Sequence, residues 1–163
     1  MTGTVLQVNV SPGGIPKVPV EQALVTGSGV EGDSHAHPQY HGGPKQVVLM
    51  LASEVLTELT GEGFALLPGS LGENVTTKGL DPRAWRAGQR WRIGDQLVIE
   101  LTKLREPCKT LSRYGRGIQK MVYDARAASG DVTSPHWAMG GFYAAVIVPG
   151  VIRKGDTVTL LAN

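Results

Sequence analysis

Short apolar runs with a period of two, each ended by glycine or proline, recur along the chain. The first spans residues 4–10 and stops at the sequence Ser11-Pro12-Gly13-Gly14. Such an alternation predicts a strand with one buried face, and clustered glycine and proline predict the turn that follows it. Because 22 glycines and 10 prolines stand among the 163 residues, we expect many turns and short elements.

About seven strands are predicted, with two or three helices between them. Beyond the first run, strand patterns occupy residues 18–25, 46–51, 73–77, 91–93, 97–102, 142–148 and 156–161. Apolar residues at helical spacing predict helices over residues 52–59 and from residue 118 onward. The pattern favours a β-rich α+β fold, a barrel or sandwich with a few peripheral helices. We expect one domain over residues 1–163, because that length suits a single core.

Composition excludes several classes of protein. The net charge of +2 gives no reason to expect a nucleic-acid partner. No apolar run approaches the roughly 18 residues of a membrane span, and the first residues lack the pattern of a signal peptide. The chain has one cysteine, so no disulfide can form within it, and we expect a cytoplasmic location where the thiol stays reduced.

The near-neutral net charge hides a strongly basic segment between Lys103 and Lys120. Six basic residues stand there against one acid, Glu106, which gives +5, while the rest of the chain carries −3. The single cysteine, Cys108, lies inside this segment. We therefore expect any chemistry of the Cys108 thiol to take place among positively charged side chains.

Cys108 follows Pro107 at a point where the apolar pattern changes to helical spacing. Unpaired backbone N–H groups at a helix start favour a thiolate, and the three cations near it in sequence would lower its pKa further: Arg105, Lys109 and Arg113. We expect these cations to act through charge from exposed positions. A thiolate of this kind can serve as a nucleophile, a sulfur carrier or a ligand of a soft metal. The alternative is a buried, inert cysteine.

Three histidines lie in a polar loop that spans residues 27–43. Their spacing, His35, His37 and His41, could supply imidazoles to zinc or iron. The nearest known pattern is that of cupins, where the first two histidines lie on a strand. Glycine and proline in this loop disfavour a strand, so a solvated loop is the simpler interpretation.

A turn at residues 68–74 offers another candidate site. Its glycines permit positive φ angles and close approach of a ligand, and Glu73 and Asn74 supply polar groups beside it. The three tryptophans, by contrast, are expected to pack in the core rather than to stack on nucleic-acid bases: Trp85, Trp91 and Trp137.

The motifs occur in an order that resembles the MOSC family, the domain named after the C-terminal part of molybdenum cofactor sulfurases. The resemblance runs from about residue 3 to residue 161 and rests on these motifs: Gly32-Asp33, His41-Gly42-Gly43 with Gln46-Val47-Val48, Pro68-Gly69-x-x-Gly72-Glu73-Asn74, Gly94-Asp95, Arg105-x-Pro107-Cys108, Gly141-Phe142-Tyr143-x3-Ile147 and Gly155-Asp156. It implies a MOSC-type β-barrel that binds the pyranopterin molybdenum cofactor or handles its sulfur.

The resemblance also assigns roles to residues. Cys108 matches the expected molybdenum ligand or sulfur acceptor, and Asp33 and His41 stand in motifs that border the cofactor pocket. Basic side chains are expected to hold the cofactor's phosphate, for which the candidates are Lys45, Arg105, Lys109 and Arg113. Glu73 and Asn74 belong to the third motif and count as cofactor-binding candidates. Pyridoxal phosphate binding is associated with the family as a whole.

Three functions follow as hypotheses. The first is an oxidoreductase that reduces N-hydroxylated small molecules with electrons from a partner protein. The second is a carrier in which Cys108 accepts a persulfide or the whole cofactor, with a sulfur-donor protein as partner. The third is a cupin-like iron or zinc protein that uses His35, His37 and His41.

Overall fold

Seven strands pair in a ring, and so form a closed barrel, in the computed structural model, which describes residues 1–34 and 43–161. The order around the ring is β11-β7-β8-β9-β5-β6-β1, and β1 pairs again with β11. The seven strands are β1 (Thr2–Val10), β5 (Val48–Ala52), β6 (Val75–Lys78), β7 (Arg90–Ile93), β8 (Leu97–Leu104), β9 (Phe142–Val148) and β11 (Thr157–Leu160). Neighbours in the ring are antiparallel except β5 and β6, so the barrel is mixed.

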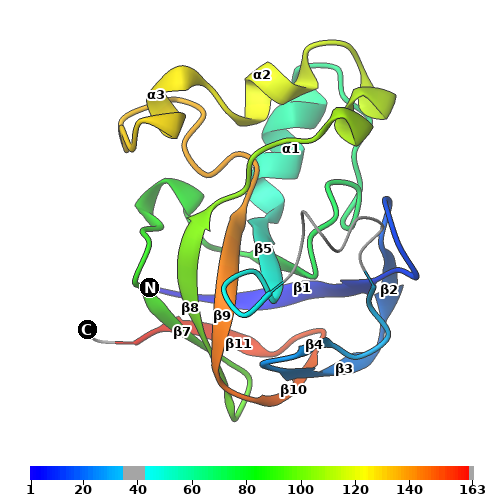
Figure 1. The fold of residues 1–163 in the computed structure, drawn as a ribbon, viewed down its shortest axis with the longest axis vertical. Helices are drawn as coiled ribbons and strands as arrows, with labels where there is room; N and C mark the ends of the chain where they lie inside the picture. The colour runs from blue at the N-terminus through cyan, green and yellow to red at the C-terminus, as the bar shows by residue number, and fades with distance from the viewer. Residues whose placement is uncertain (35–42, 162–163) are drawn as a thin grey trace.

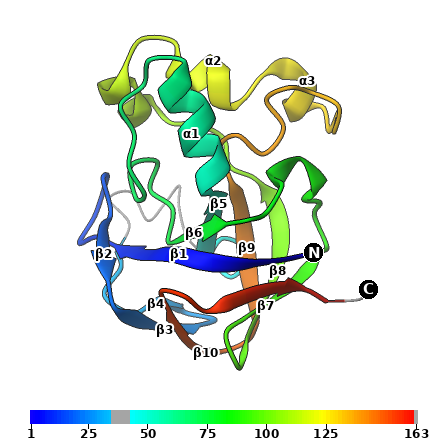
Figure 2. The ribbon, with the colours of Figure 1, turned by 180° about the vertical axis from the view of Figure 1, so that it is seen from behind.

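Helices and a small sheet close the two ends of this barrel (Figures 1 and 2). One end carries α1 (Ser53–Gly61), α2 (Ile118–Val122) and α3 (Ala125–Ala128). The other end carries a sheet of β3 (Gln22–Thr26), β4 (Gly29–Val30) and β10 (Gly150–Arg153), while β2 (Val18–Val20) extends the barrel beside β1. Two short 3-10 helices complete the described fold: η1 (Pro82–Ala84) and η2 (Lys109–Tyr114).

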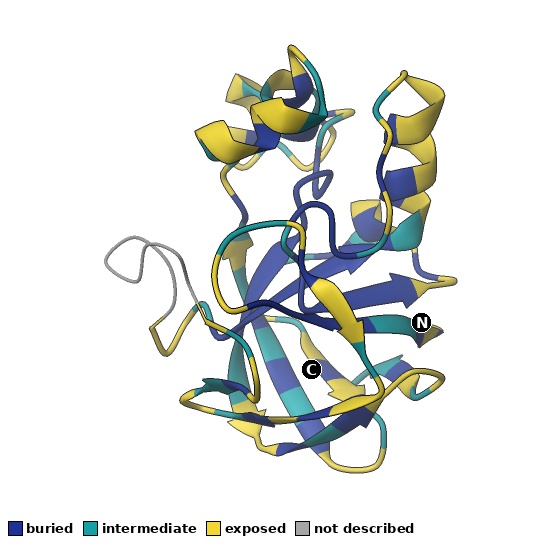
Figure 3. Ribbon diagram, turned by 90° about the vertical axis from the view of Figure 1, so that its right-hand side faces the viewer, coloured by how far each residue is buried: buried dark blue, intermediate teal, exposed yellow. Residues whose placement is uncertain are grey.

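The core follows from the predicted alternation. Buried positions lie along the strands of the barrel, and the helices expose their outer faces (Figure 3). All five residues of β5 are buried, because this strand lies between β6 and β9 and runs directly into α1. Trp85 and Trp91 are fully buried with their rings edge to face at 6.2 Å, and Trp137 is buried as well, which confirms that the tryptophans pack in the core.

Three details differ from the sequence-based expectation. The run at residues 18–25 divides into β2 and β3, which pair with different strands. The sequence pattern also missed β10, whose four residues follow Pro149 too closely to show an alternation. The helix expected from residue 118 is two short helices, because Tyr123 and Asp124 between them have extended backbone.

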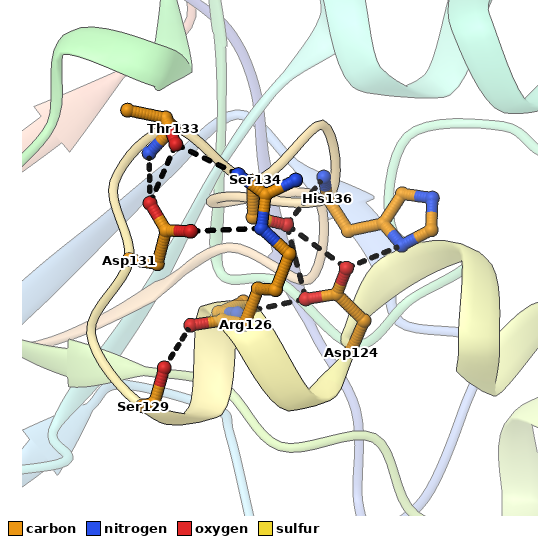
Figure 4. A network of polar contacts seen from close by, with 8 residues as sticks. Asp124, Arg126, Ser129, Asp131, Thr133, Ser134 and His136 are labelled. Carbon is orange, nitrogen blue, oxygen red and sulfur yellow. Dashed lines mark hydrogen bonds and ion pairs between the residues drawn. The ribbon is translucent and has the colours of Figure 1, made fainter.

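A polar cluster fixes the turn after α3 (Figure 4). The Asp124 carboxylate caps α3 by accepting a hydrogen bond from the Ala127 N–H at 2.7 Å. It also accepts from the Ser134 hydroxyl at 3.0 Å, and His136 Nδ1 lies 3.4 Å from it. The chain then runs into β9 through Gly140 and Gly141, which pack against the carbonyl oxygens of Arg105 and Met50.

These glycines determine where β9 begins. A Cβ atom at Gly140 would lie 2.8 Å from the Arg105 carbonyl oxygen, and the Arg105 N–H donates to the Gly141 carbonyl at 3.0 Å. Only glycine permits so close an approach, so the start of β9 is held against the end of β8. None of the described helices is long and apolar enough to cross a membrane.

Candidate functional site

A cavity of about 490 Å³ opens where β8 leaves the barrel, and loops far apart in sequence meet around it. Residues of the β1–β2 turn, of the segment before β6, of the first turns after β8 and of β9 all contribute to its wall. Four of the predicted site residues line it, namely Asn74, Arg105, Cys108 and Lys109. Its other charged residues are Lys17, Lys103 and Glu106, and the cavity therefore has a positive charge balance.

Cys108 is half-buried at the residue that precedes η2. Burial raises the pKa of its thiol, but the hydrogen bond to Thr110 and the positive charge of Arg105 outweigh burial, and the pKa is lowered overall. The Sγ atom lies 2.6 Å from the Thr110 hydroxyl oxygen. The lowered pKa was predicted from the sequence for partly the right reason. Arg105 acts as expected, whereas Thr110 was missed and Lys109 and Arg113 are not among the causes.

The Thr110 contact is open to a direct test. In Thr110→Val the side chain keeps its shape but cannot donate to a thiolate, so the Cys108 pKa should rise. We expect alkylation of Cys108 by iodoacetamide at neutral pH to slow by about two- to tenfold, the net value of one hydrogen bond. Rates measured against pH should show the whole profile shifted to higher pH. Thr57→Val on exposed α1 is the matched control, and an unchanged profile in Thr110→Val would contradict the assignment.

Arg105 differs from the expectation of an exposed cation, because the residue is only 4% exposed. Its Nε and one terminal nitrogen are buried and have no hydrogen-bond partner among the described residues. A buried charge is costly unless it is paired, and guanidinium groups have a planar fork of donors suited to phosphate. The arrangement fits an anionic ligand in the cavity, beside Cys108.

Glu73 lies behind the cavity wall and is fully buried. Its Oε1 accepts hydrogen bonds from the Gly69 N–H at 2.7 Å and from the Thr76 hydroxyl at 2.8 Å. Its Oε2 has no partner among the described residues. Burial raises the pKa of this carboxyl, although its hydrogen bonds and the charge of Arg105 oppose that effect. Glu73 therefore holds the turn at residues 69–72 through its hydrogen bond to Gly69, and its carboxyl interacts with the charge of Arg105. It does not line the cavity.

This raised pKa makes stability depend on pH with a definite sign. The folded protein binds the Glu73 proton more tightly than the unfolded chain, so this contribution is lost as pH rises above the ordinary carboxyl range. Glutamine does not ionise, so the Glu73→Gln variant does not lose this contribution to stability as pH rises. The free energy of unfolding of this variant relative to the wild type should therefore grow between about pH 4 and about pH 8. Urea unfolding at both pH values measures it, with the exposed Glu58→Gln as control. A difference that is the same at both pH values would refute the claim.

Asp33 and Lys17 form a buried ion pair that holds another part of the wall. Lys17 Nζ lies 2.5 Å from Asp33 Oδ2, and the two side chains are 7% and 4% exposed. The same carboxylate oxygen accepts from the Asn74 amide at 2.9 Å, while Asn74 Oδ1 accepts from the Leu49 N–H at 3.1 Å. Asp33 thus supports the cavity through Lys17 and Asn74, which line it. Sequence reasoning missed Lys17, because nothing near it in the chain signals a partner.

The remaining predicted residues are placed differently. Lys109 is exposed at the cavity, whereas Arg113 and Lys45 are exposed and do not line it. The Arg113 guanidinium donates to the Ile15 carbonyl and so holds a turn that does line the cavity. Ser34, from the predicted functional loop, also lines the cavity. His35, His37 and His41 lie outside the described residues.

Metal-ligating side chains do not gather elsewhere in the part of the chain that the structure describes. No group of three or more His, Cys, Asp or Glu residues is placed there to hold a metal ion. Cys108 accordingly stands as a single soft donor among cations.

Comparison with known proteins places this geometry in a family. The chain matches the MOSC domain over residues 37–159. A protein named Reductase from Gibberella moniliformis (strain M3125 / FGSC 7600) is 26% identical over 141 residues, which are 82% of this chain and 23% of that protein. The protein YiiM from Escherichia coli (strain K12) is 29% identical over 106 residues, which are 62% of this chain and 47% of YiiM. The chain thus spans about a quarter and about half of the length of these curated relatives.

Solved structures share the fold. The crystal structure of YiiM from Geobacillus stearothermophilus has a TM-score of 0.69 at 22% identity, with 98% of this chain and 75% of that chain covered. The YuaD protein from Bacillus subtilis has a TM-score of 0.71 at 19% identity, with 97% and 94% covered. At these identities the likeness establishes the fold, and it confirms the predicted β-rich barrel.

Proposed function

The chain belongs to the MOSC domain family, and from that premise we propose that it binds the pyranopterin molybdenum cofactor and reduces N-hydroxylated small molecules. The family is associated with proteins of the molybdenum cofactor, and one relative bears the name Reductase. Both facts support an oxidoreductase class. The choice of cofactor is supported by the chemistry of the cavity, and the N-hydroxylated substrate class follows from the resemblance to the family.

The residues present fit such a cofactor. Cys108 supplies a thiol of lowered pKa, and a cysteine thiolate can serve as a metal ligand. Arg105 supplies a buried guanidinium with free donors, and Lys103 and Lys109 add positive charge at the exposed side of the same cavity. These three cations would hold the phosphate of the cofactor.

The division of labour follows from this placement. When bound, the cofactor supplies two-electron redox chemistry and removal of an oxygen atom. Cys108 would hold the metal, while Arg105 would neutralise the phosphate and lowers the pKa of the Cys108 thiol. Leu49, Leu71 and Pro107 form apolar parts of the wall and exclude water from the bound ligand. The observation that carries the proposal is that two guanidinium nitrogens of the buried Arg105 have no partner among the described residues, beside a thiol whose pKa is lowered.

Elemental analysis tests the proposal directly. The protein should be purified gently from a host that makes the cofactor, and then assayed for molybdenum, tungsten and pterin. We expect near-stoichiometric metal with pterin, together with turnover of an N-hydroxylated base in the presence of an artificial electron donor. Protein that holds neither metal nor pterin would overturn the proposal.

A carrier function is the second candidate, and it rests on the incomplete burial of the Cys108 thiol. A thiolate that is partly open to its surroundings can accept a sulfur atom from a donor protein. Mass spectrometry of the same preparation distinguishes the two functions. A persulfide on Cys108 in protein without molybdenum would favour the carrier.

A further inference from the structure

The basic segment between Lys103 and Lys120 turns its charge outward. Five of its six basic residues are exposed, and we call these five the basic face: Lys103, Lys109, Arg113, Arg116 and Lys120. They lie near the end of β8, on η2, in the turn after η2 and on α2. The apolar residues of η2 and α2 point the other way, since Leu111, Ile118 and Val122 are buried.

The cations of the basic face are not paired with acids among the described residues. Exposed cations elsewhere do form ion pairs, namely Arg83 with Glu58, Arg90 with Glu100 and Arg126 with Asp131. Glu106 is the one acid of the basic segment. Like charges that gather without counter-charges repel one another, and a partner of opposite charge relieves this repulsion.

The basic face adjoins the candidate site. Lys103 and Lys109 belong to the face and also line the cavity at its exposed side. The 3-10 helix η2 starts at the residue after Cys108, and α2 packs against it at the helical end of the barrel (Figure 1). A protein that docked on this face would therefore lie against the cavity.

An acidic protein fits this face better than a nucleic acid or a membrane does. Tyr114 is the one aromatic residue of the segment, and its hydroxyl is buried while the Arg113 guanidinium lies 5.8 Å from its ring centroid, so the ring is not free to stack on a base. Within residues 103–120, all of which the structure describes, no large apolar side chain is exposed to anchor the face in a membrane. Transient electron-transfer contacts are small, and charge steers their partners together.

The proposed reaction consumes electrons and therefore needs a donor. Overall, R–NH–OH with two electrons and two protons gives R–NH2 and water. The donor is oxidised by the same two electrons, and solvent supplies the two protons. We propose that the basic face docks an acidic electron-donor protein beside the cavity, an inference that rests on the proposed function.

A double charge reversal tests the inference at positions that do not line the cavity. Arg116→Glu combined with Lys120→Glu replaces two exposed cations of the face with acids. With reduced plant-type ferredoxin, an acidic carrier, as the donor at low salt, we expect kcat/KM for ferredoxin to fall by about 10- to 100-fold. The wild-type value should fall steeply as salt is raised, because salt screens exposed charges. Calorimetric titration with ferredoxin should show a similar loss of affinity, independent of turnover.

Two controls separate docking from effects on the fold or on net charge. Reduced methyl viologen is a small cation that does not need the basic face, so turnover with it should not fall in the variant, and metal and pterin content should equal those of the wild type. Arg92→Glu combined with Lys154→Glu makes the same change of net charge at exposed positions of β7 and of the β10–β11 turn. This control should keep ferredoxin kinetics within about twofold of the wild type.

The outcomes distinguish the docking surface from the proposed function. Unchanged affinity and kcat/KM for ferredoxin in Arg116→Glu/Lys120→Glu would overturn the inference, as would an equal loss in the control pair. Tighter binding of the wild type to phosphatidylserine vesicles or to a DNA oligonucleotide than to ferredoxin would also overturn it. A wild type that turns over with methyl viologen but neither binds ferredoxin nor accepts its electrons would overturn this inference alone. A wild type without metal and without turnover with either donor would overturn the proposed function, and with it this inference.

Discussion

Replacement of Cys108 by serine should give a folded protein that has lost at least about nine-tenths of its molybdenum and its turnover. Serine has nearly the same size, but its hydroxyl is far less readily ionised than a thiol, so it cannot take the place of the Cys108 thiolate. Because Cys108 is only half-buried and contacts Thr110, the change should alter thermal stability little. Metal analysis, pterin analysis and thermal melts on the same preparations measure all three.

Ser112→Ala is the control for this experiment, because Ser112 lies on η2 outside the cavity and bonds only the backbone carbonyl of Lys109. It should retain metal and turnover. Retention of molybdenum and full activity by Cys108→Ser would refute the assignment. The chemistry would then have to be sought at other donors, among which the histidines of residues 35–41 are the first candidates from the sequence.

Replacement of Arg105 by methionine should weaken retention of the cofactor by about one to two orders of magnitude, the equivalent of about 1.5–3 kcal/mol for a hydrogen bond to a charged group. Thermal stability should stay the same or rise. Methionine fills a similar volume without a charge, and it removes two buried guanidinium nitrogens that have no hydrogen-bond partner among the described residues. Retention is measured as pterin and molybdenum remaining after dialysis at increasing salt.

The prediction is specific because cofactor retention should fall while thermal stability stays the same or rises. Arg92→Met removes a charge from an exposed position of β7 and serves as the control, with no expected loss of cofactor. If Arg105→Met unfolds while retention in the folded fraction is unchanged, Arg105 is a structural residue. In the stable variant, the pKa of Glu73 should rise further, because Arg105 no longer opposes the effect of burial.

Most elements of the fold could be predicted from local pattern. The alternation at residues 4–10 gave β1, and the apolar spacing over residues 52–59 gave α1. Pairing could not be predicted in the same way. Closure of the barrel depends on β1 and β11, which lie at opposite ends of the chain, and no local period encodes their register. The short β10 was missed because four residues are too few to show a period.

The residues of the candidate site also differ in whether local sequence could predict them. Cys108, Arg105 and Lys109 stand close together in sequence, so their meeting at one cavity followed from the segment itself. The motif with Tyr143 was recognised, but its position in the wall depends on pairing of β9 with β5 and β8. Lys17 gave no local signal at all.

The sequence by itself predicted a β-rich fold and a thiol of lowered pKa in a basic segment, because these depend on side-chain alternation, turn residues and charges within a few positions of one another. The barrel and the family followed from the resemblance of its motifs to the MOSC family. The tertiary structure decided that Arg105 is buried with two nitrogens unpartnered among the described residues, that Glu73 lies behind the wall and that Asp33 pairs with Lys17. These outcomes depend on burial and on contacts between distant segments. Burial sets the cost of each charge, and the folded chain alone determines which charges are buried together.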